Sequence, residues 1–102
     1  MSKIMVIAKL KLNNENLLED WKTISKKIDS DLAGADGFIS RDSVQGEDGM
    51  IYCVLKWESK SQQEKFMADV MSRTNEESQA MMAEFGRVVD MESMSKEFFE
   101  VL

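Results

Sequence analysis

The N-terminal segment 3–12 alternates in hydrophobicity with a period of two, which is typical of a β-strand. Its even-numbered positions, from Ile4 to Leu12, are all apolar. Its odd-numbered positions after Lys3 are Met5 and Ile7, followed by Lys9 and Lys11. A strand with two largely apolar faces needs cover on both sides. We therefore expect one face to lie against the chain's own helices and the other against a partner sheet.

A hairpin is predicted in the middle of the chain. Segments 38–44 and 50–58 resemble strands, and the glycine-containing turn 46–49 joins them. In the second arm, alternate residues form two faces that are again mostly apolar: Ile51, Cys53, Leu55 and Trp57 on one, and Met50, Tyr52, Val54 and Lys56 on the other. This pattern is typical of a central strand that is covered on both sides.

The remaining segments have helical periodicity or a weak strand pattern. Apolar residues recur every three or four positions from about 14 to 33, and the glycines that follow are expected to end this helix in a left-handed conformation. Helical spacing returns from Ser59 and again over about 75–86, where Gly86 is expected to close the helix. Residues 87–94 alternate weakly and are predicted as a fourth strand, while the tail 96–102 fits either a short helix or an edge strand.

The predicted order is β-α-β-β-α-β, which is the ferredoxin-like arrangement of the α+β class. We expect one domain over residues 1–102, with a four-stranded antiparallel sheet and helices on one face. A chain of this length buries only about two-thirds of its unfolded surface, so a second copy would add core. The face with Met5, Ile7, Tyr52 and Val54 is expected to be covered in a homodimeric α/β barrel.

Composition excludes several kinds of site. The chain has no histidine, which removes Ser/His/Asp triads, histidine-bound zinc or non-heme iron, and a proximal heme ligand. Its single cysteine cannot form an internal disulfide, and the formal net charge of −6 argues against a nucleic-acid partner. The sequence contains no apolar run long enough to span a membrane, and we expect a cytoplasmic protein.

One segment resembles a known family. The run Tyr52–Lys60, followed by Gln63 and Phe66, is similar to the third strand and second helix of antibiotic biosynthesis monooxygenases, which are small dimeric α/β barrels. The resemblance implies two subunits packed sheet to sheet, each with a pocket between sheet and helices. It also implies cofactor-free oxygenation of a small aromatic or quinol substrate.

The heme-degrading branch of that family is a poorer match. Its asparagine, tryptophan and histidine correspond here to about Ala8, Phe66 and Asn75 or Glu76, so all three positions differ. The resemblance therefore implies neither heme nor another bound cofactor or metal.

Candidate site residues follow from these expectations. Catalytic candidates are Asn75 to bond a carbonyl oxygen, Arg41 to stabilise an anion, and Tyr52 to relay a proton, although strand parity turns Tyr52 toward the dimer interior. The proposed substrate-pocket walls are Trp21, Phe38, Trp57, Phe66, Met71 and Phe85. Each has a structural alternative: the aromatic residues can be core, with Trp21 packed on Trp57, and Asn75 can cap a helix.

Two functions remain open from the sequence. The first is a cofactor-independent monooxygenase-like enzyme for a small aromatic or quinol. The second is a non-catalytic small-molecule-binding or stress-related dimeric barrel that has lost the polar site residues.

Overall fold

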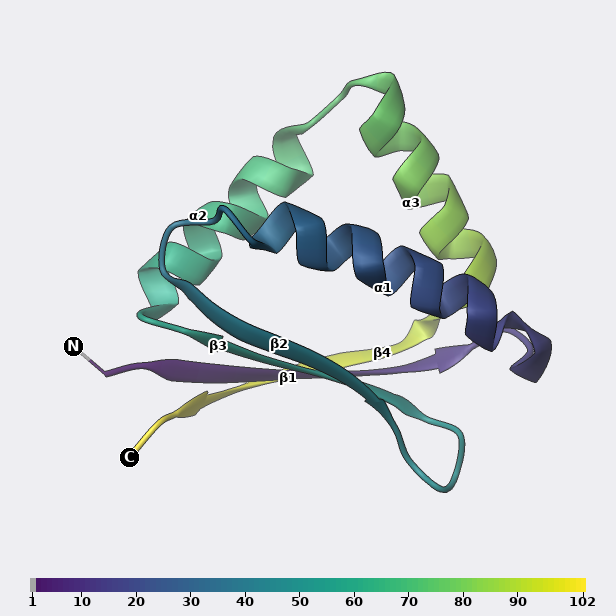
Figure 1. Cartoon of the computed structure of the whole chain (residues 1–102), viewed down its shortest axis with the longest axis horizontal. Coiled ribbons are helices and arrows are strands. Elements are labelled where there is room, and N and C mark those ends of the chain that lie inside the picture. The colour runs from purple at the N-terminus through teal and green to yellow at the C-terminus, as the bar shows by residue number, and fades with distance from the viewer. Residues whose placement is uncertain (1) are drawn as a thin grey trace.

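The computed structural model describes residues 2–102 and has a layer of helices on one face of a four-stranded antiparallel sheet (Figure 1). The elements in chain order are β1 (Ile4–Leu12), a 3-10 turn η1 (Glu15–Leu17), α1 (Leu18–Leu32), β2 (Phe38–Gln45), β3 (Ile51–Trp57), α2 (Lys60–Ser72), α3 (Glu76–Val88) and β4 (Val89–Glu100). The strand order is β2-β3-β1-β4. This confirms the ferredoxin-like α+β fold. Helices α2 and α3 form an inverted V above α1 (Figure 1).

The strand register assigns the two faces of the sheet. Ile4 pairs with Trp57 and Leu10 with Ile51, so the even-numbered residues of β1 and the odd-numbered residues of β3 share one face. The buried residues form two clusters beneath the helices, one with Leu10, Trp21, Ile24, Ile51, Cys53, Val88 and Val89 and the other with Ile4, Val6, Leu32 and Trp57. The opposite face has no helix over it (Figure 1).

Two predicted element ends differ from the structure, and the tail follows one of its two predicted alternatives. The ambiguous tail is strand, because β4 continues to Glu100 along the whole of β1. Gly86 does not close α3, which continues to Val88 and leads directly into β4. Gly34 does not have the left-handed conformation expected after α1; within residues 2–102 that conformation occurs at Gly37, with φ 82°, and at Gly49, with φ 87°.

Gly37 joins the end of the α1–β2 connection to the start of α2. Its carbonyl oxygen accepts a hydrogen bond of 2.7 Å from the Glu58 backbone N–H. A Cβ atom at this position would collide with the side-chain amide of Gln62. The positive φ therefore favours glycine, and a side chain here would also require the flexible end of Gln62 to move.

Replacing Gly37 by alanine is expected to lower the free energy of unfolding by about 2 kcal/mol, because the new side chain is strained and displaces Gln62. Gly34→Ala is the matched control, since a Cβ there meets no atom within 4 Å and the backbone has no positive φ. Urea unfolding of both variants measures the difference. Equal stabilities would show that Gly37 is not constrained.

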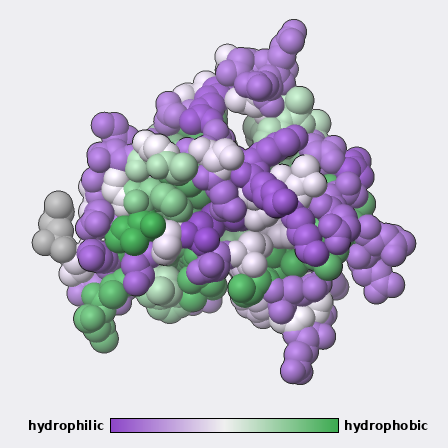
Figure 2. Space-filling view, in the orientation of Figure 1, coloured by the Kyte–Doolittle hydropathy of each residue, from purple (hydrophilic) through white to green (hydrophobic). Residues whose placement is uncertain are grey.

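None of the helices within residues 2–102 is long and apolar enough to cross a membrane. Figure 2 shows hydrophilic side chains over most of the helix layer, while hydrophobic residues reach the surface at several places in the lower part of the view, where the sheet lies.

Candidate functional site

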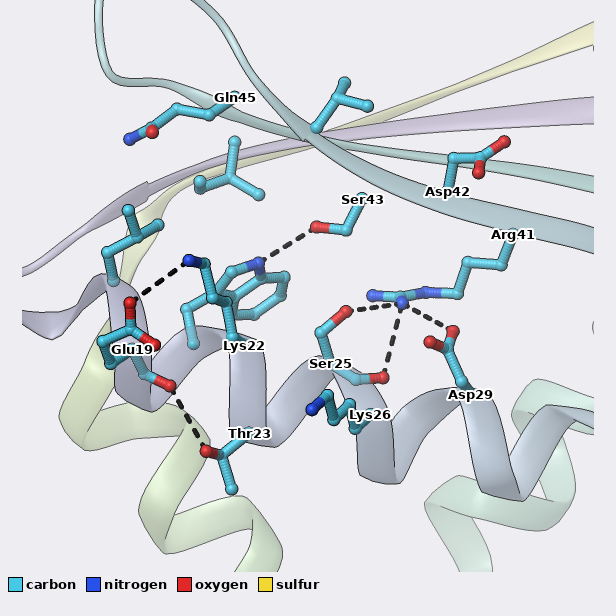
Figure 3. Close-up of a pocket in the computed structure, with 14 residues that line it drawn as sticks. Glu19, Lys22, Thr23, Ser25, Lys26, Asp29, Arg41, Asp42, Ser43 and Gln45 are labelled. Atoms are coloured by element: carbon cyan, nitrogen blue, oxygen red, sulfur yellow. Dashed lines mark hydrogen bonds and ion pairs between the residues drawn. The ribbon is translucent and has the colours of Figure 1, made fainter.

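A groove of about 620 Å³ runs between helix α1 and the edge strand β2 (Figure 3). Helix α1 contributes Trp21, Ser25 and Asp29 to its lining, and β2 contributes Arg41 and Ser43. Its size is within the range of small-molecule sites in proteins. Two of the site residues predicted from the sequence, Arg41 and Trp21, line this groove.

The guanidinium of Arg41 lies at the wall of this groove with only 3% of its side chain exposed. One terminal nitrogen donates hydrogen bonds to Ser25 Oγ at 2.7 Å and to Asp29 Oδ1 at 2.8 Å. The other is 3.5 Å from Cys53 Sγ. Figure 3 shows Ser25 and Asp29 pointing from α1 toward Arg41. A positive charge in this largely water-free position interacts more strongly with an anion than an exposed charge does.

Cys53 lies beneath Arg41 in the buried part of β3. Burial raises the pKa of its thiol, and the nearby positive charge of Arg41 only partly opposes this effect. The thiol is therefore protonated at neutral pH and is not an activated nucleophile. It packs in the core as a small hydrophobic residue.

Trp21 forms the inner wall of the same groove. Its indole Nε1–H donates to Ser43 Oγ at 3.0 Å, and its ring meets Phe85 edge to face with centroids 6.1 Å apart. Trp21 is 3% exposed. Its N–H group is therefore hydrogen-bonded to β2, and its apolar ring packs against α3.

A bulge in β2 accounts for this arrangement. Phe38 pairs with Trp57, but the register shifts between Phe38 and Ser40, so that Arg41 pairs with Leu55. Phe38 and Arg41 therefore both face the helices, although they are an odd number of residues apart. Residue type in the sequence indicates Arg41 but not its partners Ser25 and Asp29. The available signal was their spacing of four residues, which aligns them on one side of α1.

A second groove, of about 890 Å³, lies between α1, α2 and α3. Its apolar lining includes Ile24, Val70, Met71, Met81 and Met82, and its rim is charged. The predicted wall residue Met71 and the predicted catalytic residue Asn75 both lie here, away from Arg41.

Asn75 is the N-cap of α3. Its Oδ1 accepts a hydrogen bond of 2.8 Å from the Ser78 backbone N–H, which is the capping role that the sequence offered as the alternative to catalysis. The side-chain oxygen is therefore engaged by the backbone.

The Asn75→Ala substitution is expected to lower the free energy of unfolding by about 1 kcal/mol, because the first turn of α3 loses its cap. Asn75→Asp keeps a capping oxygen and is expected to stay near wild type. Thermal unfolding compares the two. A catalytic role for the amide would instead appear as equal loss of activity in both variants.

The other predicted residues lie elsewhere. Trp57 packs between Phe38 and Phe66, with ring centroids 5.6 and 5.5 Å away, and Phe85 packs on Trp21. The expected contact of Trp21 with Trp57 is wrong: the two indoles belong to separate clusters at opposite ends of the sheet. Tyr52 pairs with Lys9 and lies on the helix-free face, as parity predicted. The six predicted wall residues therefore do not line one common pocket.

One buried polar atom stands apart from both grooves. The indole Nε1 of Trp57 is buried and has no hydrogen-bond partner within the described part of the chain. Trp57 is 1% exposed and is surrounded by apolar side chains. Its N–H group therefore lowers stability relative to an apolar ring of the same shape.

Comparison with known proteins gives similarity in structure only. No family model and no curated protein matches this chain. Among solved structures, a candidate antibiotic biosynthesis monooxygenase from Caulobacter crescentus CB15 is similar over 99% of this chain and 91% of its own, with a TM-score of 0.77 and 12% identity. SnoaB, a cofactor-independent oxygenase from Streptomyces nogalater, is similar over 100% of this chain and 95% of its own, with a TM-score of 0.75 and 7% identity.

A third structure, Rv0793 from Mycobacterium tuberculosis, is similar over 99% of this chain and 96% of its own, with a TM-score of 0.73 and 14% identity. At these identities the similarity establishes architecture and not chemistry. The chain thus has the fold of the antibiotic biosynthesis monooxygenase type over essentially its whole length, as the segment Tyr52–Lys60 indicated.

Proposed function

We propose that the protein is a cofactor-independent monooxygenase for a small phenol or quinol, which binds in the α1–β2 groove beside Arg41. The single observation that supports this most is the guanidinium, 3% exposed, at the wall of an open groove of about 620 Å³. The fold, shared with a cofactor-independent oxygenase, supports the same reaction class.

The residues of the groove have distinct parts in this proposal. The substrate ring lies in the groove near Trp21, and its oxygen approaches Arg41 as the substrate loses a proton. The fixed positive charge stabilises the resulting phenolate or enolate in a partly water-free position. This anion is electron-rich enough to react with oxygen itself: one oxygen atom becomes a carbonyl oxygen on a ring carbon. The other oxygen atom takes the hydrogen displaced from that carbon and one proton from solvent, which replaces the proton lost when the anion formed, and leaves as water.

Ser25 and Asp29 act on Arg41 and not on the substrate. Their hydrogen bonds hold one edge of the guanidinium against α1. The planar group is then fixed in orientation before substrate binds, which is the condition for effective electrostatic stabilisation.

Oxygen uptake by the pure protein tests this function. We expect consumption above buffer with at least one member of a panel of hydroquinones, naphthoquinols and anthrones. Arg41→Met should reduce the rate at least about hundredfold, as for removal of a donor to a developing oxyanion. Lys22→Met, which removes an exposed cation from the same groove, is the matched control. No uptake with any substrate would contradict the enzyme proposal.

A non-catalytic binding protein is the second candidate. The favouring observation is that the Phe38, Trp57 and Phe66 side chains pack on one another and fill the space beneath α2. Under this alternative, aromatic compounds bind and raise the melting temperature without any oxygen uptake.

We also propose that the protein acts as a homodimer through the helix-free face of the sheet. Met5, Ile7, Tyr52 and Val54 lie on this face, where Val44 is 51% and Phe99 44% exposed. A contiguous apolar surface of this kind is typical of an interface. Light scattering at micromolar concentration should give twice the 11.7 kDa chain mass. A monomer would contradict the dimer without bearing on the groove.

A further inference from the structure

The second groove, of about 890 Å³ between α1, α2 and α3, has no part in the proposed reaction. None of its lining residues in the described chain belongs to a strand, so it lies within the helix layer, where α2 and α3 form the inverted V (Figure 1). Helix α1 separates it from the α1–β2 groove, because the helical period turns two sets of side chains to opposite sides. The sets are Asp20, Ile24, Lys27 and Asp31 for the second groove, and Lys22, Lys26 and Asp29 for the α1–β2 groove.

The second groove has an apolar lining that water reaches. The lining comes from all three helices: Ile24 from α1, Val70 and Met71 from α2, and Met81 and Met82 from α3. Met71 is 71% exposed and Met82 64%, more than any other large apolar side chain in the helices. A ligand that covers them removes apolar surface from water, and the unbranched thioether side chains can adapt to its shape.

The rim of the second groove has an excess of negative charge. Two cations line it, Lys27 and Arg73. Twice as many carboxylates line it, namely Asp20, Asp31, Glu77 and Glu84. Glu77 forms no ion pair within residues 2–102. Its charge is therefore free to interact with a ligand.

Ion pairs with neighbouring residues do not remove this excess. Arg73 is 3.3 Å from a carboxylate oxygen of Asp31 and 2.9 Å from one of Asp69. Arg87, which does not line the groove, is likewise shared by the rim carboxylates of α1 and α3. One arginine balances only half of the charge of two carboxylates. An organic cation is therefore attracted to this rim, and an organic anion is repelled.

The size of the second groove favours a small molecule over a peptide helix. Its 890 Å³ falls within the range of small-molecule sites, about 300–1,000 Å³. A three-turn helix about 16 Å long and 10–12 Å wide would occupy about 1,500 Å³. The groove is therefore too small for a docked helix of useful length.

We propose that the second groove binds a small amphiphilic cation, with its apolar part on Met71 and Met82 and its positive group among the rim carboxylates. This site goes beyond the proposed oxygenation, because it uses neither Arg41 nor the α1–β2 groove. The ligand class is defined by two features together: an apolar chain or ring and a single ammonium-type charge.

Methyl NMR of the full chain tests this proposal, because its nine methionines serve as separate probes. The protein is labelled with methionine carrying a ¹³C methyl group and titrated with decyltrimethylammonium below its micelle concentration. We expect saturable shifts at Met71, Met81 and Met82, with a Kd of about 0.1–1 mM, and no shifts at Met50. Decanoate, an anion of the same chain length, should bind at least about tenfold more weakly. Tetramethylammonium, which lacks the chain, should cause no saturable shift.

Two pairs of variants separate the apolar and the charged contributions. Met71→Gln/Met82→Gln should raise the Kd for decyltrimethylammonium about tenfold, whereas Met91→Gln/Met94→Gln, which changes exposed methionines of β4, should leave it unchanged.

For the charges, Asp31→Asn/Glu77→Gln should remove the preference for decyltrimethylammonium over decanoate. Glu15→Gln/Glu47→Gln makes the same change in net charge at exposed residues outside the groove and should keep that preference.

The remaining outcomes would overturn the proposal. They are the absence of saturable shifts, saturable shifts only at methionines outside the groove, and equal affinity for decanoate in the wild type. Shifts at Met71 and Met82 with a basic amphipathic peptide but not with decyltrimethylammonium would overturn the small ligand in favour of a helical partner. Shifts of the same two signals on dilution without ligand would show that a second copy occupies the groove.

Discussion

Trp57→Ala is expected to lower the free energy of unfolding by about 4 kcal/mol, because it removes a fully buried indole and leaves a cavity. Phe38 and Phe66 lose the ring that lies between them, and Leu32 and Val6 lose part of their packing. The free energy of unfolding of a domain of about 100 residues is roughly 5–15 kcal/mol, so the Trp57→Ala substitution removes a large part of it. Urea unfolding at one fixed protein concentration measures it.

A matched pair of conservative variants separates ring packing from hydrogen bonding. Trp57→Phe removes an N–H group that has no partner, whereas Trp21→Phe removes one that donates to Ser43 at 3.0 Å. Trp21→Phe should therefore be the more destabilising by about 1 kcal/mol. The opposite order would show that Trp57 Nε1 has a partner in solution.

Arg41→Met is expected to cost about 2–3 kcal/mol of stability in addition to its effect on oxygen uptake. It removes the bonds to Ser25 and Asp29 and leaves the buried Ser25 hydroxyl without its donor. The loss is smaller than for a fully buried ion pair because Asp29 is 52% exposed and regains water.

Two further variants separate the effect of charge from the effect of hydrogen-bond geometry at Arg41. Asp29→Asn keeps the side-chain shape but removes the charge, and we expect a loss of about 1 kcal/mol with oxygen uptake largely retained. Arg41→Lys keeps a positive charge but not the planar fork, so an activity that needs oriented donors should fall nearly as far as in Arg41→Met. Thermal unfolding and oxygen uptake measured on the same samples give both quantities. Full activity in Arg41→Met would remove the guanidinium from the mechanism.

The fold was predictable because its central strands have apolar residues on both faces. The alternation from Ile4 to Leu12 and from Ile51 to Trp57 defines two strands that need cover above and below, and helical spacing between strands supplies the upper layer. The extent of β4 was less clear. Its last residues are exposed at the edge of the sheet, where the pattern of burial is weak.

The composition of the site was only partly predictable. Arg41 and Trp21 could be named from residue type, but their neighbours depend on the bulge between Phe38 and Ser40, which has no clear sequence signal. Likewise, periodicity assigns Trp21 and Trp57 to the same layer but does not give their distance along the sheet. They lie near opposite ends of β1, and neither of the two grooves described above is lined by both.

The fluorescence of single-tryptophan variants tests whether the α1–β2 groove binds the substrate. Trp57→Phe leaves Trp21, which lines the groove, as the only tryptophan, and Trp21→Phe leaves Trp57, which does not. Titration with an active quinol, or with a phenol from the same panel, should quench Trp21 in a saturable way and leave Trp57 nearly unchanged. Saturable quenching of Trp57 with no change at Trp21 would show that the substrate binds outside this groove.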